Sequence, residues 1–584
     1  MPLTPDTRRK IDQIRDYLYG GGYPDPMSNA EQLAFLFFFY LSESIDADNQ
    51  RRAKITKKSY EGIFSGDWAL RNPLNAPKPG QKKIPKEHLR WSVWAKARNG
   101  EGLVRFVRDE VFPFYTEVAS RSAVNFMDGA RLAIDEPTVL TQIVNLVDEL
   151  RLDQADADTK GDLFEHVLKQ IKQAGELGQF RTPRHVIRAI VEMIDPQIGE
   201  TVYDPAAGTA GFLVAAYDHI RLNNSSDAAI EEVELDGKKV KRGHGDKLSA
   251  AKWNILGSQT FFGNDVDNKM VHLATMSLTL RGLPNVRIAR RNVLTTTLDA
   301  QQKSELGLPL DGYNVILANP PFSGRLDKDR VVEDVKVGTT TATEILFLKY
   351  MMDNLKPGGR CGVIVPEGVL FGSTGAHKEL RRQLIENNSV QAVLSLPGGV
   401  FQPYSGVKTS VLLFEKPALS KVEGGGTTKH VLFLHADNDG YKLDAQHDTP
   451  IEQDDLPALI AAYKDRDACW KKWRAFRAVR SESFDTSAPV RPELVEGSQE
   501  RARPAQDKPV EARTPTEWTE KWWFTTAEEL RANDYNLSAG RYRPLSQAQV
   551  EHRDPRELLD ELAAIEVEIA EEIEGLKVVL AEKF

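Results

Sequence analysis

Cysteine is scarce in this chain of 584 residues, which contains only two and has no Cys-x-x-Cys pair. These absences exclude a disulfide scaffold and a zinc cluster built on cysteine thiolates. The longest apolar run, Leu33 to Leu41, is far shorter than the roughly 20 residues needed to span a bilayer. The first residues also lack an apolar signal core, so we expect a protein of the reducing cytoplasm without membrane association.

Positive charge is in deficit as well, because 85 acidic residues face 76 basic ones and the net charge is -9. Self-sufficient nucleic-acid-binding proteins usually have a basic balance. Any nucleic acid would therefore be bound by a local basic groove or with the help of a partner. The chain has no Gly-x-Gly-x-x-Gly after its Asp204 strand, which argues against a nicotinamide-dependent oxidoreductase, and no Walker A lysine motif, which argues against a translocase.

The apolar pattern divides the chain into five parts. Residues 1–155 show helical spacing and predict an N-terminal helical domain. In residues 156–450 short apolar runs alternate with helical segments, which is typical of a mostly parallel sheet with helices on both faces. Residues 451–484 form a basic and aromatic helical segment, for which we favour packing on the sheet domain over phosphate contact. The proline-rich stretch 485–517 is expected to be a disordered insertion, and 518–584 a C-terminal helical tail beyond the end of the sheet.

Two shorter segments interrupt the sheet pattern. Between residues 227 and 246, an Asp236-Gly237 dipeptide between alternating residues predicts a β-hairpin with a tight turn. The polar stretch 323–343 fits either a solvated connection or a lid that orders over a substrate, and the sequence does not decide between them.

The first candidate site lies between a predicted strand at 201–203 and a predicted helix at 210–222. Asp204 is followed by small residues up to Gly211. Small side chains let a ligand approach the backbone, and the helix N-terminus offers unpaired N–H groups to a carboxylate or phosphate. Asp204 itself can accept a hydrogen bond from an ammonium group. Taken alone, an ordinary strand-to-helix turn explains this motif equally well.

Two further motifs follow predicted strands. Asp265 ends the apolar run that begins at Phe261, where doubly wound folds place an acid that accepts both ribose hydroxyls. A third strand delivers Asn319-Pro320-Pro321-Phe322. Prolines restrict their own φ and the preceding residue, so the Asn319 amide and the Pro320 carbonyl are held as two rigid acceptors for a planar amine. The ring of Phe322 offers a stacking face.

Together, Asp-Pro-x-x-Gly-x-x-Gly at 204–211 and Asn-Pro-Pro-Phe at 319–322 resemble the S-adenosylmethionine-dependent N6-adenine DNA methyltransferases. More narrowly, the chain resembles the modification (M) subunit of type I restriction–modification systems. Similar segments also occur at 177–184, 355–366, 401–416 and 534–542, in the order of the family. The resemblance implies a Rossmann-like methyltransferase sheet and direct methyl transfer to N6 of a flipped adenine, without a metal.

Carried over by position, the resemblance assigns two groups of residues. The target adenine would be gripped by Asn319, Pro320, Pro321 and Phe322. S-adenosylmethionine would be bound by Gln179, Phe180, Arg181, Thr182, Pro183, Arg184, Asp204, Ala206, Ala207, Gly208, Thr209, Ala210, Gly211, Asp265 and Asn292. Two residues depart from the family pattern: Arg181 replaces the usual aromatic, and Ala210 stands where many members have glycine.

The resemblance also implies partners. Double-stranded DNA would be the substrate, sequence recognition would come from a specificity (S) subunit, and a restriction (R) subunit would join for cleavage, with two M subunits per S. The apolar stripe of the segment after Asp554 is a natural docking surface for helices of the S subunit. Three alternatives remain: a methyltransferase acting on protein glutamine or RNA, a catalytically silent scaffold, and the oxidoreductase disfavoured above.

Overall fold

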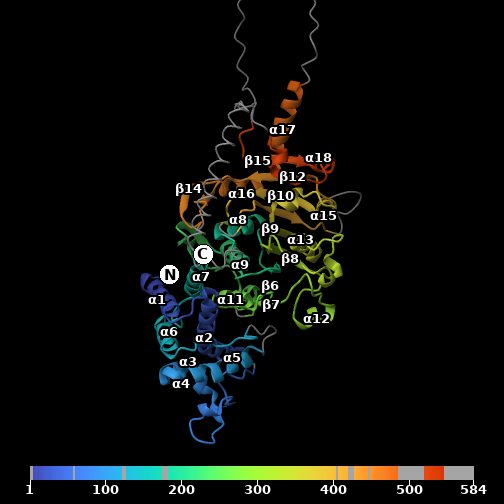
Figure 1. The fold of residues 1–584 in the computed structure, drawn as a ribbon. Helices are drawn as coiled ribbons and strands as arrows, with labels where there is room; N and C mark the ends of the chain where they lie inside the picture. The colour runs from blue at the N-terminus through green and yellow to red at the C-terminus, as the bar shows by residue number, and fades with distance from the viewer. Residues whose placement is uncertain are drawn as a thin grey trace, which may run out of the picture. The chain divides into compact units, whose positions relative to one another are not determined.

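The computed structural model describes residues 4–56, 59–120, 127–173, 182–283, 285–402, 405–418, 427–444, 447–484 and 518–544 (Figure 1). The chain divides into two compact units, Met1–Lys471 with Lys521–Tyr542, and Lys472–Glu520 with Arg543–Phe584. Gln179, Phe180, Arg181, the insertion 485–517 and the stripe after Asp554 lie outside the described residues. Within those residues, we find no helix with the length and apolar character needed to cross a membrane.

The N-terminal region of the first unit is helical, as its apolar spacing predicts. The predicted positions Ile11, Ile14 and Leu18 are buried in one core, which Met270 and Leu273 of the sheet region extend. The elements are α1 (Pro5–Gly20), α2 (Pro26–Thr56), β1 (Asp67–Ala69), β2 (Lys83–Pro85), α3 (Trp91–Ala97), α4 (Gly100–Phe106), α5 (Phe112–Ala119), α6 (Pro137–Glu149) and α7 (Ala157–Gln173). The short strands β1 and β2 form a hairpin that the sequence pattern does not indicate.

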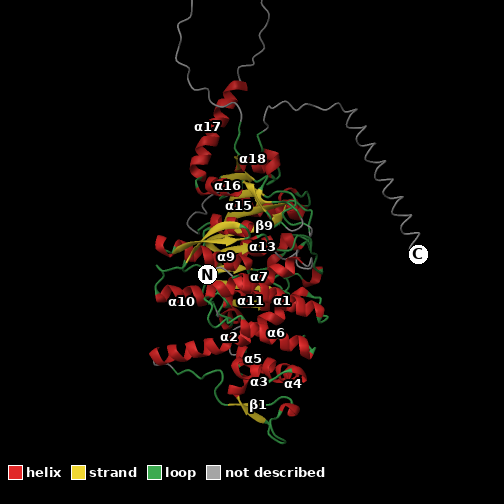
Figure 2. Ribbon diagram, turned by 90° about the vertical axis from the view of Figure 1, so that its left-hand side faces the viewer, coloured by secondary structure: helices red, strands yellow, loops and turns green. Residues whose placement is uncertain are grey.

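A nine-stranded sheet in the order β15-β12-β10-β11-β9-β8-β3-β6-β7 forms the centre of the first unit (Figure 2). The strands are β3 (Val202–Asp204), β6 (Phe261–Asp265), β7 (Arg287–Arg290), β8 (Tyr313–Ala318), β9 (Leu355–Pro366), β10 (Ser389–Ser395), β11 (Thr409–Glu415), β12 (His430–His435) and β15 (Trp522–Thr526). From β9 to β7 every pairing is parallel, whereas β11 runs antiparallel to both neighbours. The predicted Rossmann-like sheet is confirmed.

Helices cover both faces of this sheet. Tyr203 on β3 reaches the hydroxyl of Tyr350 on α13, while Gly362 on β9 lies against Ile190 and Ile194 on α8. Tyr203 and Gly362 occupy successive rows of the sheet, so α13 and α8 lie on opposite faces. The helices are α8 (Arg184–Ile194), α9 (Gly211–Asn223), α10 (Ala250–Ser258), α11 (Asn268–Thr279), α12 (Ala300–Glu305), α13 (Thr343–Asn354), α14 (Glu367–Phe371), α15 (Gly375–Asn387), α16 (Leu456–Lys464), α17 (Arg466–Phe484), α18 (Ala527–Ala532) and α19 (Ala539–Tyr542).

The expectation that the sheet ends near residue 450 is wrong. β13 (Asp439–Tyr441) pairs with β14 (Pro450–Asp454), and β15 joins the main sheet as an edge strand antiparallel to β12. The segment Trp522–Thr526 buries four of its five residues, because three consecutive aromatic residues and a threonine suit a covered strand. The region 518–544 is therefore not purely helical.

Two other expectations hold. β4 (Ile230–Leu235) and β5 (Lys238–Gly243) form the predicted hairpin, and both turn residues, Asp236 and Gly237, have positive φ. The basic and aromatic segment packs as a helix, since the Trp470 ring stacks on His430 of β12 at 4.1 Å. In the second unit Trp473 of the same helix contacts Trp518.

Candidate active site

The loop after β3 turns sharply into α9. The backbone N–H of Ala206 donates to the Asp204 carboxylate at 3.0 Å, which closes the first part of the turn. Gly208 and Ala210 both have left-handed backbone conformations, with φ of 51° and 65°. Ala210 is the residue that caps α9, so a position that favours glycine holds an alanine here. The turn brings the start of α9 directly to the carboxyl end of β3.

Asp265 ties this loop to the neighbouring strand β6. One carboxylate oxygen accepts from the Gly208 N–H at 3.0 Å, and the other accepts from the Asp267 N–H at 2.9 Å. Burial raises the pKa of Asp265. Burial also raises the pKa of Asp204 to about 8; the hydrogen bond from the Ala206 N–H lowers this pKa, and the negative charge of Asp265 raises it further. A buried acid, Asp204, and a half-buried one, Asp265, thus lie close together, and a bound cation or hydroxyl would offset the desolvation of each.

The Asn319 side chain is held at the end of β8 in one orientation. Its amide nitrogen donates to the hydroxyl of Thr182 at 2.9 Å. Its amide oxygen is buried and has no hydrogen-bond partner among the residues that the structure describes. Leaving a buried acceptor without a partner costs about 1–3 kcal/mol, so such an atom is expected to meet a donor from a ligand.

Phe322 lies beyond the two prolines and is half-buried. Its ring contacts Phe401 edge to face, with centroids 5.3 Å apart and planes at 83°. The stretch that follows is not a simple solvated connection, because Val331, Val335 and Val337 are buried. A lid function for this stretch stays a prediction.

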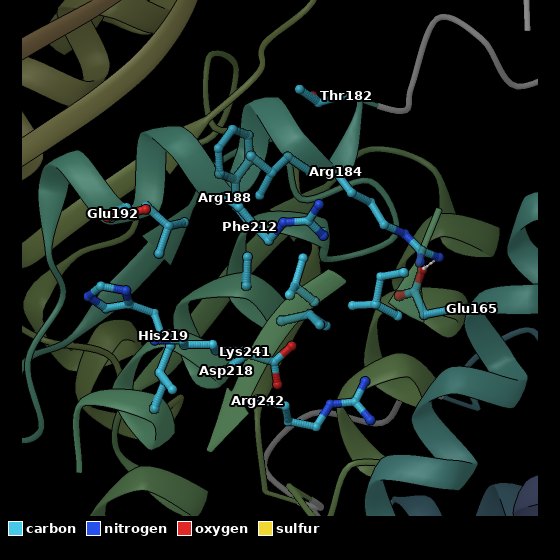
Figure 3. Close-up of a pocket in the computed structure, with 18 of the residues that line it drawn as sticks. Glu165, Thr182, Arg184, Arg188, Glu192, Phe212, Asp218, His219, Lys241 and Arg242 are labelled. Atoms are coloured by element: carbon cyan, nitrogen blue, oxygen red, sulfur yellow. Dashed lines mark hydrogen bonds and ion pairs between the residues drawn. The ribbon is translucent and has the colours of Figure 1, made fainter. Parts of the chain in front are cut away.

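A cavity of about 610 Å³ joins the first and third motifs. It is bounded by α8, α9 and the β4–β5 hairpin (Figure 3). The predicted site residues that line it are Thr182, Arg184, Asp204, Ala206, Ala207, Thr209, Gly211 and Asn319. Asp265, Asn292 and Phe322 are not among its lining residues, and the Asn292 side-chain oxygen instead accepts from the Leu294 N–H at 3.0 Å.

The cavity also has charged walls, and of their residues the sequence motifs identify Arg184 and Asp204 alone. Arg184 pairs with Glu165, and Arg242 makes two hydrogen bonds to Asp162. Asp218 points into the cavity in Figure 3, and burial raises its pKa although nearby arginines oppose this. The spacing of lining residues on α9, at 211, 215, 218 and 222, is the one sequence signal that could have found this wall.

Beneath the site, a network of polar side chains connects three strands to α13. The Tyr203 hydroxyl donates to the Asn264 oxygen at 2.9 Å and lies 3.1 Å from the Tyr350 hydroxyl. Arg291 donates to the Asn264 oxygen at 3.0 Å and to the Tyr350 hydroxyl at 3.3 Å. We call these four residues the floor network.

The floor network helps to orient the predicted cofactor residues, because its members are their neighbours in the sequence. Tyr203, Asn264 and Arg291 each directly precede a predicted cofactor residue, namely Asp204, Asp265 and Asn292. Since neighbouring residues on a strand point to opposite faces, anchoring the first residue of each pair orients the second.

The comparison with protein families identifies the family to which the chain belongs. A family model described as N-6 DNA Methylase matches residues 155–552, more than half of the chain. The chain belongs to the N-6 DNA methylase family. The predicted adenine-specific DNA methyltransferase is thereby confirmed at the level of the family, and the resemblance to type I modification subunits is confirmed by relatives.

Three relatives of this N-6 DNA methylase family member show how far the similarity extends. The type I restriction enzyme EcoEI methylase subunit of Escherichia coli is 30% identical over 384 residues, 62% of this chain and 68% of that protein. A chain from a structural study of complex assembly in a type I restriction–modification system is 25% identical, with a TM-score of 0.62 and full coverage of both chains.

The third relative shares the fold alone. The type I methyltransferase subunit from Streptococcus thermophilus has a TM-score of 0.56 at 16% identity and covers 93% of this chain and 99% of its own. Other type I methylase subunits are matched over 58% of their length, so this chain spans a little over half of them.

Proposed function

We propose that the chain is the modification subunit of a type I restriction–modification enzyme, which methylates N6 of adenine in double-stranded DNA. The observation that carries the proposal is the Asn319 amide. Its nitrogen is engaged by Thr182, and its oxygen is buried without a partner at the wall of the cavity. An amide oriented in this way leaves its oxygen as an acceptor for a substrate, which suits an exocyclic amine.

The residues around the cavity fit S-adenosylmethionine. Asp204 is a buried acceptor suited to the ammonium group, and Ala206, Ala207, Thr209 and Gly211 line the cavity where the amino acid moiety would lie. Asp265 would hold the ribose, Asn292 the adenine, and Thr182, Pro183 and Arg184 the methionine end. Residues 179–181 complete that last group in the proposal. When bound, the cofactor supplies an electrophilic methyl group on its sulfonium sulfur.

The target adenine must leave the duplex to reach Asn319, at a cost of a few kcal/mol. Stacking on Phe322 would recover about 1–3 kcal/mol of that cost. The Asn319 oxygen and the Pro320 carbonyl would then accept hydrogen bonds from the two N6–H groups. Both acceptors would favour a more tetrahedral nitrogen, whose lone pair would attack the methyl group in line, with departure of the sulfur as the neutral thioether and loss of one N6 proton to solvent. Catalysis here is mostly positioning.

Assembly is the second part of the proposal. The chain carries net negative charge, and relatives named as type I methylase subunits cover most of it. We infer that an S subunit reads the DNA sequence, that two M subunits join each S, and that an R subunit adds cleavage. The complex would act in the cytoplasm on host DNA. The docking stripe after Asp554 lies outside the described residues and stays a prediction.

The alternative functions differ in whether they require the Asn319 oxygen as an acceptor. A silent scaffold would need no orphan acceptor at the end of β8, so the buried Asn319 oxygen argues against it. A methyltransferase acting on protein glutamine or on RNA would use the same acceptor pair. Only the identity of the methylated product separates these substrates from DNA adenine.

The test combines the chain with its co-expressed neighbouring subunit, labelled S-adenosylmethionine and plasmid DNA. We expect N6-methyladenine in the DNA, identified after digestion to nucleosides, and only with the partner present. Label found in protein or RNA, or in cytosine, contradicts the proposal. Cofactor binding without any transfer to DNA would indicate the scaffold.

A further inference from the structure

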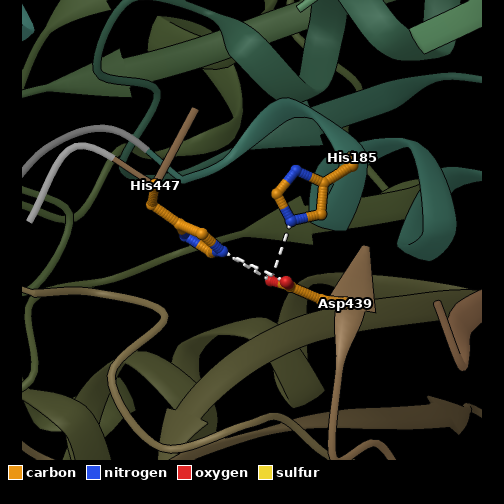
Figure 4. Close-up of side chains that lie close together, drawn as sticks. All are labelled: His185, Asp439 and His447. Atoms are coloured by element: carbon orange, nitrogen blue, oxygen red, sulfur yellow. Dashed lines mark hydrogen bonds and ion pairs between the residues drawn. The ribbon is translucent and has the colours of Figure 1, made fainter. Parts of the chain in front are cut away.

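Two histidines converge on one buried aspartate away from the cavity (Figure 4). His185 Nε2 lies 2.8 Å from Asp439 Oδ2, and His447 Nε2 lies 3.0 Å from the same oxygen. The residues come from α8, from β13 and from the connection between β13 and β14. Among the described residues this is the one group of three histidine, cysteine or acidic side chains whose ligand atoms all lie within 4.8 Å of one another.

Both ring nitrogens of His447 face oxygen atoms that can only accept hydrogen bonds, and a neutral imidazole cannot donate to both. Its Nδ1 lies 3.2 Å from the carbonyl oxygen of Val400, which can only accept a hydrogen bond. Its Nε2 faces the Asp439 carboxylate, which also accepts only. A neutral imidazole has one N–H, so one of the two contacts sets a lone pair against a lone pair. Either a second proton or a cation bound between Nε2 and the carboxylate resolves this.

The protonation states of the other two groups are compatible with a cation. Burial alone would raise the pKa of Asp439, but hydrogen bonds from His185 and His447 bring it below its ordinary value, so the group is a carboxylate. Burial lowers the pKa of His185, although Asp439 opposes this, and a neutral imidazole is the form that binds metals.

The surroundings resemble the outer shell of a metal site. A metal-binding histidine commonly donates its second N–H to a backbone carbonyl, and the Val400 carbonyl lies 3.2 Å from His447 Nδ1, where it would accept such a bond. The Tyr441 ring stacks on His185 at 4.2 Å and fixes its orientation. Asp439 and His447 are buried, so water is largely excluded.

We propose that His185, Asp439 and His447 bind one divalent transition metal ion of the zinc type. Two imidazole nitrogens and one carboxylate oxygen, with a fourth position for water, form a recognised zinc donor set. The ion would join the start of α8, two residues after Thr182, to His447 beside the carbonyl of Val400, which precedes Phe401 at the Phe322 ring. The binding itself does not depend on the proposed methylation.

The experiment uses the full chain without a polyhistidine tag. After loading with zinc chloride and gel filtration, elemental analysis should find about one zinc per chain. Competition with a chromophoric chelator should show that Asp439→Asn and His447→Gln each weaken zinc binding by at least about 100-fold, since even outer-shell changes cost 10–100-fold. Bound cobalt should give visible absorption that the variants lack.

His435→Gln is the matched control, because His435 also pairs with an aspartate, Asp437, at 3.1 Å. It should retain wild-type zinc content. Zinc should also raise the melting temperature of the wild-type chain, and a chelator should reverse this, because ligands that bind only the folded state stabilise it. No zinc uptake by the wild-type chain, or equal uptake by Asp439→Asn, overturns the proposal in favour of a doubly protonated His447 paired with Asp439.

Discussion

The floor network and the rim of the site contain similar polar residues in opposite states. In the floor, Tyr203, Asn264, Arg291 and Tyr350 contact one another through hydrogen bonds of 2.9–3.3 Å, and of their side-chain atoms Arg291 Nε alone is buried without a partner among the described residues. At the rim, Asp204 directly follows Tyr203 and is buried with a raised pKa, and the Asn319 oxygen at the end of β8 has no partner among the described residues. The floor stabilises the fold, whereas the rim leaves hydrogen-bonding capacity for ligands. The predictions below test that division.

The largest effect is expected at Asn319. Asn319→Ala removes the rim acceptor and should lower methylation by about 10²–10³-fold or more, the usual loss when one preorganised hydrogen-bonding group is removed. Cofactor affinity, measured by calorimetry, should stay within about 3-fold. The control Asn354→Ala, which removes an amide that bonds only to the Tyr350 carbonyl, should retain activity. Full methylation by the Asn319 variant would refute the rim assignment.

Asp204→Asn should weaken cofactor binding but increase the stability of the cofactor-free chain. Losing a charge-assisted hydrogen bond should weaken S-adenosylmethionine binding by about 10–100-fold. For the wild-type chain, affinity should rise with pH up to about 8, because the ammonium group needs the carboxylate form. Isothermal titrations between pH 6 and 8.5 measure both effects.

The same variant should stabilise the cofactor-free chain. Folding raises the pKa of Asp204 from 3.8 to about 8, so the carboxyl destabilises the fold increasingly as pH rises between these values. Asparagine cannot ionise, and at about 1.36 kcal/mol for each pH unit between these values the gain should reach about 5 kcal/mol at pH 8 and vanish near pH 4. Urea unfolding at both pH values would show this, and an equal gain at pH 4 would contradict it.

In contrast to Asp204→Asn, the variant Asn264→Ala should lower the stability of the fold. Removing the shared acceptor takes one of two partners from each of Tyr203 and Arg291, and it takes the donor from the Ala289 carbonyl, which should cost about 1–3 kcal/mol of unfolding free energy. Because Asn264 touches no predicted ligand, methylation per folded molecule should fall much less than in Asn319→Ala. A stable but inactive variant would place Asn264 in the rim.

Ala210→Gly should have the smallest effect. Relief of the left-handed conformation is worth about 1 kcal/mol, and loss of a buried methyl costs about 0.8 kcal/mol, so the two nearly cancel. Ala207→Gly loses a buried methyl without that relief and should destabilise by about 1 kcal/mol more. Equal denaturation midpoints for the two variants would show that the Ala210 backbone is unstrained.

Local patterns predict the strands and turns that carry the site. The Asp236-Gly237 hairpin, the turn at Asp204 and the strand before Asn319 follow from alternation, small residues and prolines within a few positions of each other. The edge strand Trp522–Thr526 could not be placed this way, because its partner β12 lies about 90 residues away across a proline-rich stretch.

By itself, the sequence determined the family, the order of the motifs and the residue types available for chemistry, because these depend on neighbours along the chain. Only the tertiary structure decided which polar atoms are paired. The amide of Asn319 is oriented by Thr182, and Asp439 contacts two histidines from separate segments of the chain. Such pairings depend on distances across the fold, and burial makes each unpaired atom costly enough to indicate where a ligand belongs.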